Sequence, residues 1–164
     1  MKTNLTLIGM PGAGKSTTGI ILAKNLGLGF IDTDVLIQIN QQMRLQNILD
    51  TKGYLALRLV EEKEILKINL ENHVISTGGS VVYSEKAMIH LQNISQIIFL
   101  NANFDTLVKR INNFATRGIA KAESQTFKDL FNERQLFYKK YADIIIDCND
   151  LAQDLSAEQI AKLL

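Results

Sequence analysis

The feature that most constrains the fold of this chain is a glycine-rich stretch that joins an apolar run to an amphipathic one. Residues 5–8 form a short, mainly apolar run that ends at Gly9, and apolar residues recur at helical spacing over residues 16–26. A strand, a tight loop and a helix in this order form the opening unit of a parallel α/β sheet. We therefore expect an α/β fold built outward from this unit.

The loop itself matches the phosphate-binding pattern G-x-x-x-x-G-K-[ST] through Gly9, Gly14, Lys15 and Ser16. Glycines let successive backbone N–H groups point into one concavity, and the following helix adds its positive end. The lysine can neutralise the β- and γ-phosphates, and the serine hydroxyl is a suitable Mg²⁺ ligand. An accidental match is the alternative, but the flanking strand and helix make it rare. The sequence predicts a site for ATP formed by Gly12, Ala13, Gly14, Lys15, Ser16 and Thr17.

The rest of the chain repeats this alternation of short apolar runs with segments of helical character. The pattern predicts a doubly wound, five-stranded parallel sheet of the P-loop NTPase type, with helices on both faces. The expected strands are residues 5–8, 28–31, 74–76, 96–100 and 143–146. The expected helices are residues 16–26, 33–40, 45–50, 54–70, 84–91, 103–111, 124–141 and 156–164.

Local chemistry refines some of these boundaries. Gly27 is placed to end the first helix, and Ser156 with Gln159 three residues later forms a capping box for the last. The leucines at positions 55, 59 and 66 are expected to lie in the core. Residues 112–123 mix Gly, Ala, Thr and Asn with basic residues and interrupt the alternation, so we expect a mobile lid there.

Length and charge limit the class of protein. A chain of 164 residues that is 46% hydrophobic can fill one core, so residues 1–164 are expected to form a single domain. Lys plus Arg total 18 against 17 Asp plus Glu, which argues against a nucleic-acid partner. The lone Cys148 and the lack of a signal peptide or membrane span favour the cytoplasm and no membrane partner. We expect a monomer, although no feature of the sequence sets the oligomeric state.

The acidic residues distinguish among P-loop proteins. The chain has no N-K-x-D motif for guanine, and the third expected strand ends without the acidic pair typical of mechanical ATPases. Asp32 and Asp34 instead follow the second strand, which aims both at the phosphate site if they do not merely cap a helix. A carboxylate near the γ-phosphate can orient an acceptor hydroxyl or accept its proton. This arrangement indicates phosphoryl transfer to a small molecule.

Further motifs follow the P-loop, which runs from Gly9 to Gly19. They are Asp32-Thr33-Asp34, Arg58-Leu59-Val60-Glu61, Gly78-Gly79, the lid arginine Arg117, and Arg134 followed by Tyr138 and Ala142-Asp143. Taken together, these motifs resemble those of the shikimate kinase family over nearly the whole chain.

The resemblance implies that ATP phosphorylates one ring hydroxyl of shikimate, a small cyclic polyol carboxylate, with Mg²⁺ present. It also implies an acceptor-binding helical segment at about residues 33–62. Without the resemblance, solvated surface charges are the alternative for the arginines at 58 and 134. The implied roles are catalysis by Lys15, Asp34 and Arg117, acceptor binding by Asp34, Arg58, Gly78, Gly79 and Arg134, metal binding by Ser16 and Asp32, and adenine contact by Arg110.

Departures from the family pattern gather around the acceptor pocket. Ser80 stands where the family usually has a third glycine, Gly118 follows the lid arginine in place of proline, and Leu49 and Leu57 replace aromatic residues. These changes leave the phosphate-binding residues intact and bear on the choice of acceptor.

Two alternatives therefore remain beside a shikimate kinase. One is a related kinase for another small hydroxy acid or polyol. The other is a non-catalytic nucleotide-binding module that controls a partner protein. The joint presence of Lys15, Asp34 and Arg117 argues against the second, because a pure binder has no need of an acceptor carboxylate.

Overall fold

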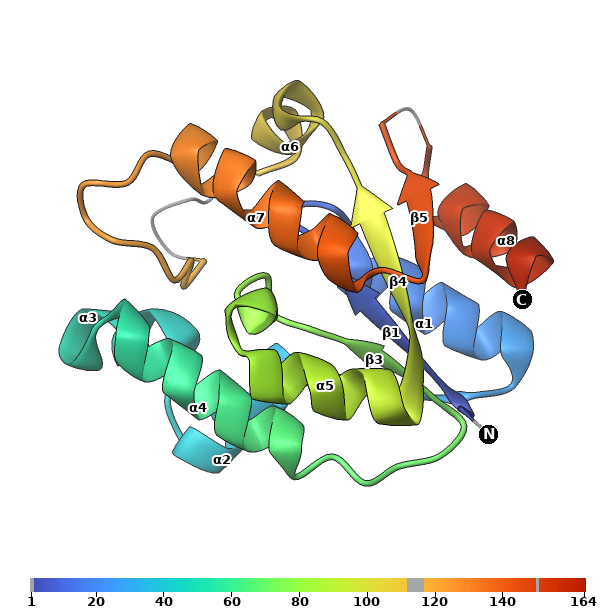
Figure 1. Ribbon diagram of the computed structural model, residues 1–164, viewed down its shortest axis with the longest axis horizontal. Helices are drawn as coiled ribbons and strands as arrows, with labels where there is room; N and C mark the ends of the chain where they lie inside the picture. Colours follow the sequence, from blue (N-terminus) through green and yellow to red (C-terminus); the bar gives the residue numbers. More distant parts are fainter. Residues whose placement is uncertain (1, 112–116, 150) are drawn as a thin grey trace.

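A five-stranded parallel sheet forms the centre of the structure, a computed structural model that describes residues 2–111, 117–149 and 151–164 (Figure 1). The strand order is β2-β3-β1-β4-β5, and every neighbouring pair is parallel. The predicted sheet is confirmed, and each strand lies within one residue of its expected bounds. The strands are β1 Asn4–Ile8, β2 Gly29–Asp32, β3 His73–Ser76, β4 Ser95–Asn101 and β5 Ile144–Asp147.

Helices cover both faces of this sheet, as predicted. Helices α1 (Lys15–Leu26) and α8 (Gln153–Leu163) pack on one face, and α5 (Glu85–Ile94) and α7 (Phe127–Tyr141) on the other (Figure 1). The remaining elements are α2 Thr33–Gln41, α3 Leu45–Lys52, α4 Tyr54–Leu66, the short 3₁₀ helix η1 Val81–Tyr83 and α6 Phe104–Arg110.

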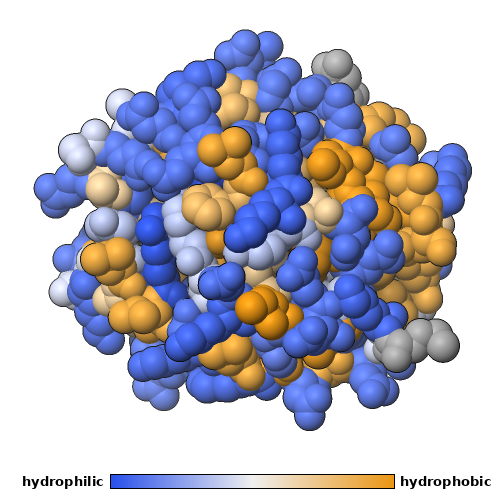
Figure 2. Space-filling model, viewed as in Figure 1, coloured by the Kyte–Doolittle hydropathy of each residue, from blue (hydrophilic) through white to orange (hydrophobic). Residues whose placement is uncertain are grey.

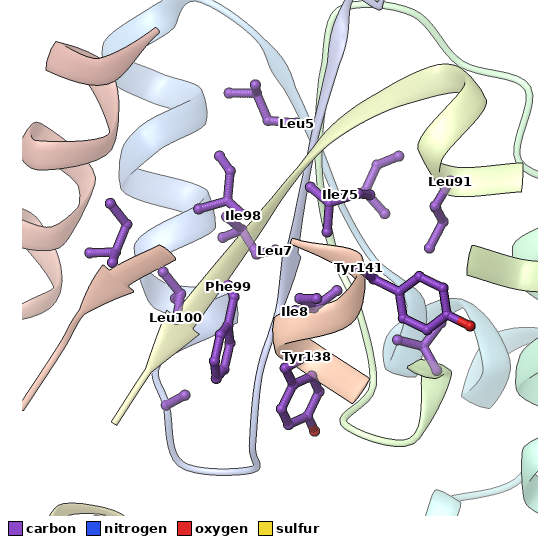
Figure 3. Close-up of a cluster of buried hydrophobic side chains, with 14 of the residues drawn as sticks. Leu5, Leu7, Ile8, Ile75, Leu91, Ile98, Phe99, Leu100, Tyr138 and Tyr141 are labelled. Carbon is purple, nitrogen blue, oxygen red and sulfur yellow. The ribbon is translucent and has the colours of Figure 1, made fainter. Parts of the chain in front are cut away.

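The main core lies between the sheet and these helices. Leu7, Ile98 and Phe99 on the two central strands are fully buried, as expected for strands covered on both faces. The ring of Tyr138, on α7, stacks on Phe99 with 5.0 Å between centroids, and Figure 3 shows both rings beside Ile8. Burial of each such side chain contributes about 1.5–3 kcal/mol. This core fixes α7 against the sheet.

A second, smaller core joins the helical segment at about residues 33–62 to the chain beyond position 117. Its buried members are Ile37, Ile48, Leu57 and Ala120. The segment before α7 therefore returns to the body of the protein over α2, α3 and α4. Residues 112–116 of the predicted lid lie outside the described residues.

Several helix boundaries differ from the sequence prediction; α5 ends at Ile94 rather than at residue 91, and α7 begins at Phe127 rather than at residue 124. Gly27 does end α1 with a left-handed φ of 68°, but Ser156 does not begin the last helix. Ser156 lies inside α8, and its hydroxyl donates to the carbonyl of Ala152 at 3.2 Å. Serine can bond backward in this way as well as cap, so the capping-box prediction there was wrong. Helix α4 of the acceptor-binding segment also ends at Leu66 rather than at residue 70.

The placement of three leucines was also wrong. Leu55, Leu59 and Leu66 are 60%, 59% and 42% exposed, because α4 turns a different stripe inward. That inner stripe includes Glu61, and it faces the site described below. On the face in Figure 2, hydrophilic side chains predominate and apolar ones lie scattered among them. Among the described residues, no helix is both long and apolar enough to cross a membrane.

Candidate active site

A pocket of about 150 Å³ opens at the carboxyl edge of the sheet, next to β1. The strand order reverses at β1, and ligands of doubly wound sheets bind in the crevice at such a reversal. The loop after β1, the start of α2, the loop after β3, residues 117–120 and α7 form its walls. The predicted site residues among its lining are Gly12, Gly14, Lys15, Ser16, Thr17, Asp34, Gly78, Gly79, Arg117 and Arg134.

The floor of the pocket is the P-loop. Gly14 has a φ of 94°, a backbone conformation that is strained for residues with a side chain. This glycine places the amino end of α1 at the pocket. Lys15 is 8% exposed, and its Nζ donates to the carbonyls of Gly9 at 2.7 Å and Met10 at 3.0 Å. Burial lowers the pKa of Lys15 to about 8, against the opposing effect of Asp34. A bound phosphate would favour the charged form of this lysine.

Oxygen ligands for a metal lie beside the lysine. The Ser16 hydroxyl donates to Oδ2 of Asp32 at 2.5 Å and lies 3.3 Å from the hydroxyl of Ser76. Oδ1 of Asp32 accepts the backbone N–H of Asp34 at 3.0 Å, so Asp32 also caps α2. Hard oxygen donors suit Mg²⁺, which takes few protein ligands and completes its shell with phosphate oxygens and water. Among the described residues, no group of three or more His, Cys, Asp or Glu side chains is placed to hold a metal ion.

Asp34 projects from the first turn of α2 into the pocket. Burial in the pocket raises the pKa of its carboxyl to about 6, and the charge of Asp32 raises it further, while Lys15 and Arg117 oppose the shift. A carboxylate with this pKa is still ionised near neutral pH and can accept a proton.

Two arginines converge on one backbone oxygen. Arg134 is 1% exposed, and its Nη2 donates to the carbonyl of Ala120 at 2.8 Å. Nη2 of Arg58 reaches the same oxygen at 3.5 Å. The Nε atoms of both arginines are buried without a hydrogen-bond partner. Since the ion pair found among the described residues is Lys67 with Glu64, neither guanidinium is paired with a carboxylate.

The burial of Arg134 means that it is not a solvated surface charge. Arg58 reaches the Ala120 carbonyl beside Arg134, and it lines a neighbouring cavity of about 390 Å³. We call this space the outer cavity. The Arg58 guanidinium stacks on the rings of Tyr83 and Tyr54, with Cζ 3.6 Å and 5.0 Å from their centroids.

Two further predicted residues lie away from the pocket. Ala13 is buried within the P-loop. Nη2 of Arg110 donates to the carbonyls of Cys148 at 2.8 Å and Leu151 at 3.3 Å, which ties α6 to the loop between β5 and α8. Its contact with adenine stays a prediction. Arg117, in contrast, lines the pocket, and its side chain is exposed to solvent.

Sequence reasoning missed the residues that hold the glycine pair after β3. The hydroxyl of Tyr138 donates to the carbonyl of Gly79 at 2.6 Å, and Thr33 accepts the N–H of Gly78 at 3.2 Å. A Cβ on Gly79 would lie 2.8 Å from Nη1 of Arg134, so a side chain at this position would displace the Arg134 guanidinium. These partners lie 45 and 59 positions away in the chain, and no local pattern indicates them.

Glu61 also lines the pocket, and the motif Arg58-Leu59-Val60-Glu61 predicted no role for it. It is 3% exposed, and burial raises its pKa from 4.5 to about 7, with the charge of Asp34 acting in the same direction. Its position four residues after the buried Leu57 was the available signal, because both lie on one stripe of α4.

The buried Glu61 should make stability depend on pH. Its pKa is higher in the folded chain, so the folded chain holds more protons between pH 4.5 and about 7, and stability falls as the pH rises through this window. We expect Glu61→Gln to raise the free energy of unfolding at pH 8 by up to about 3 kcal/mol and to have little effect at pH 4.5. Urea denaturation at both pH values tests this. Glu62→Gln, on the same helix, is the control, and equal stability of both variants at pH 8 would contradict the prediction.

Enzymes that phosphorylate small molecules through a P-loop combine such a sheet with a phosphate cradle and an acceptor carboxylate, and the chain falls in this class. Comparison with known proteins is more specific, because the family model described as shikimate kinase matches residues 11–164. The chain therefore belongs to the shikimate kinase family, whose members are ATP-dependent small-molecule kinases.

Individual relatives agree over nearly their full length. A shikimate kinase of a Sulfurihydrogenibium species is 33% identical over 96% of this chain and 95% of its own. A shikimate kinase from Caldanaerobacter subterraneus is 32% identical over 97% of this chain and 94% of its own. The solved structure of shikimate kinase from Acinetobacter baumannii in complex with shikimate superposes with a TM-score of 0.92 at 25% identity, over 99% of this chain and 93% of that one.

Proposed function

We propose that this chain transfers the γ-phosphoryl group of ATP to a hydroxyl of shikimate. The observation that carries the proposal is Arg134, a buried cation without a carboxylate partner in the same pocket as Lys15 and Asp34. A buried charge is costly unless it is paired, so the pocket favours an anionic acceptor. The names of the relatives and the shikimate bound in the Acinetobacter baumannii structure support this choice.

The acceptor would be held by its two kinds of polar group. Its carboxylate would take the place of the Ala120 carbonyl as the partner of Arg134 and Arg58, since charge-assisted bonds to a carboxylate are stronger than those to a neutral carbonyl. Backbone groups at Gly78 and Gly79 would approach the ring closely. Asp34 would orient the reacting hydroxyl and accept its proton.

The nucleotide would be held at the other end of the pocket. Backbone groups of residues 12–17 would bind the phosphates, and Arg110 would flank the adenine. Lys15 and Arg117 would stabilise the charge on the transferred phosphoryl group. Mg²⁺ would be held by Ser16 and Asp32, where it would neutralise phosphate charge. We further propose that the chain acts as one domain and as a cytoplasmic monomer, with residues 117–123 as part of a lid.

An ADP-release assay with shikimate and a panel of other small hydroxy acids and polyols tests the proposal. We expect turnover with shikimate that requires Mg²⁺. Turnover with a different acceptor alone would favour a related kinase. Tight ATP binding without turnover of any acceptor would favour the nucleotide-binding module and reject the proposed activity.

Arg134→Ala is expected to raise the KM for shikimate roughly 30-fold, because the acceptor loses a charge-assisted partner worth about 2 kcal/mol. The KM for ATP should change little. Lys139→Ala removes an exposed cation from the same helix and serves as the control. An equal KM for shikimate in both variants would show that Arg134 does not bind the acceptor.

A further inference from the structure

The wall between the pocket and the outer cavity is made by Glu61 of α4 and Ser80 of the loop after β3, both of which line both spaces. Both side chains are buried, at 3% and 7% exposed. The Ser80 hydroxyl donates a short hydrogen bond to Oε2 of Glu61. Glycine at position 80 would offer no such donor, so the hydrogen bond is a feature of this chain's own sequence.

The other oxygen of Glu61, Oε1, is buried and has no hydrogen-bond partner in the part of the protein that the structure describes. A Cβ built on Gly78 would touch both this oxygen and Oδ1 of Asp34, the latter at 2.8 Å, so the two carboxyl groups face one small volume above Gly78. A buried polar atom without a partner is costly, and a ligand hydroxyl in this volume could satisfy it.

Ser80 also decides which Glu61 oxygen carries the proton when the carboxyl is neutral. While Oε2 accepts the hydrogen bond from Ser80, the proton of the neutral carboxyl lies on Oε1. A hydroxyl group both donates and accepts, so it can lie between a protonated Oε1 and the carboxylate of Asp34.

We propose that Ser80 is a positioning residue for acceptor specificity: it holds the Glu61 carboxyl so that Oε1 donates to one acceptor hydroxyl, which in turn donates to Asp34. This inference rests on the acceptor site proposed above. Such a pair selects an acceptor that carries the bridging hydroxyl, because an analogue without it leaves two buried polar groups unpaired.

The charges around Glu61 are compatible with a neutral carboxyl. Burial is the largest influence and raises the pKa of Glu61 to about 7. The charge of Asp34 on α2 acts in the same direction, while the charges of Arg134 on α7 and Lys15 on α1 oppose it. Arg58 and Tyr83 face the wall from the outer cavity. The hydrogen bond from Ser80 favours the charged form, so its loss should raise the pKa of Glu61.

Ser80→Ala, with Ser80→Thr to restore the hydroxyl, tests the proposal. For Ser80→Ala we expect a roughly tenfold rise in the KM for shikimate, an unchanged KM for ATP, and a higher Glu61 pKa. The pKa is read by ¹³C NMR titration of carboxyl-labelled, ligand-free protein, with the Glu61 signal assigned by its loss in Glu61→Gln. Ser80→Thr should restore both values. For one monodeoxy analogue of shikimate, the difference between wild type and Ser80→Ala should vanish.

The proposal is overturned if Ser80→Ala leaves both the KM for shikimate and the Glu61 pKa unchanged, or if its KM effect persists with every monodeoxy analogue. Glu62→Gln is the matched control, because Glu62 accepts a hydrogen bond from Ser84 at 2.6 Å and lines only the outer cavity. If wild type turns over shikimate and Ser80→Ala changes neither the KM for shikimate nor the Glu61 pKa, this inference is rejected while the proposed function is not. If wild type does not use shikimate, the proposed function fails, and an unmoved Glu61 pKa in Ser80→Ala would still reject the hydrogen-bonded pair.

Discussion

Replacing Lys15 by methionine should lower kcat about 10³-fold, the scale found when one preorganised donor to a transition-state charge is removed. The methionine keeps most of the apolar stem but loses the ammonium group that lies over the P-loop carbonyls of Gly9 and Met10. The KM for shikimate should change much less, because Lys15 belongs to the phosphate end of the pocket. Single-turnover kinetics with saturating ATP and shikimate measure the effect on the chemical step.

Lys24→Met is the matched control, since Lys24 is an exposed lysine in the last turn of the same helix. It should retain wild-type kcat and melting temperature. If Lys15→Met kept kcat within a few-fold of wild type while binding ATP normally, the lysine would only bind the ground state, and its proposed role in catalysis would be wrong.

The phosphate half of this site could be predicted from the sequence because its residues are contiguous. The run from Gly9 to Ser16 specifies its own strand, loop and helix start, and Asp34 follows a strand whose position the apolar pattern also gives. Local patterns of this kind depend on backbone conformation within a few residues, which the sequence carries directly.

The acceptor half depends on contacts between distant residues, and there the prediction was less complete. Both stripes of α4 carry leucines, so periodicity alone did not show that Leu57 and Glu61 face inward while Leu55 and Leu59 face solvent. Arg58 lies beside Arg134, since both guanidinium groups reach the Ala120 carbonyl, but the sequence did not indicate that Arg58 would also stack on Tyr83 and line the outer cavity.

The same limit applies to Ser80. The sequence showed an unusual residue at the end of the glycine pair but not its partner, which lies 19 positions earlier on another element. The effect of such a residue can be inferred only when the packing that places a buried carboxyl beside it is known. In the proposed acceptor site, α4 and the loop after β3 therefore act together.

Asp34 offers the most direct test of that acceptor site. Asp34→Asn is expected to lower kcat between about 10² and 10⁴-fold, the contribution typical of a positioned acid or base. The amide keeps the size of the side chain and can still accept a hydrogen bond, but it cannot take the proton of the attacking hydroxyl. ATP binding, measured by calorimetry, should stay within a few-fold of wild type because the P-loop is unchanged.

Two further variants separate the charge of Asp34 from its position. Asp34→Glu retains the carboxylate but moves it by one methylene, and since a displaced catalytic group loses most of its effect, we expect a loss of kcat close to that of Asp34→Asn. Asp105→Asn changes an exposed aspartate in the first turn of α6 and should leave kcat unaltered. If Asp34→Asn retained wild-type kcat, the acceptor hydroxyl would have to be activated elsewhere, and Glu61 would be the remaining carboxyl in the pocket among the described residues.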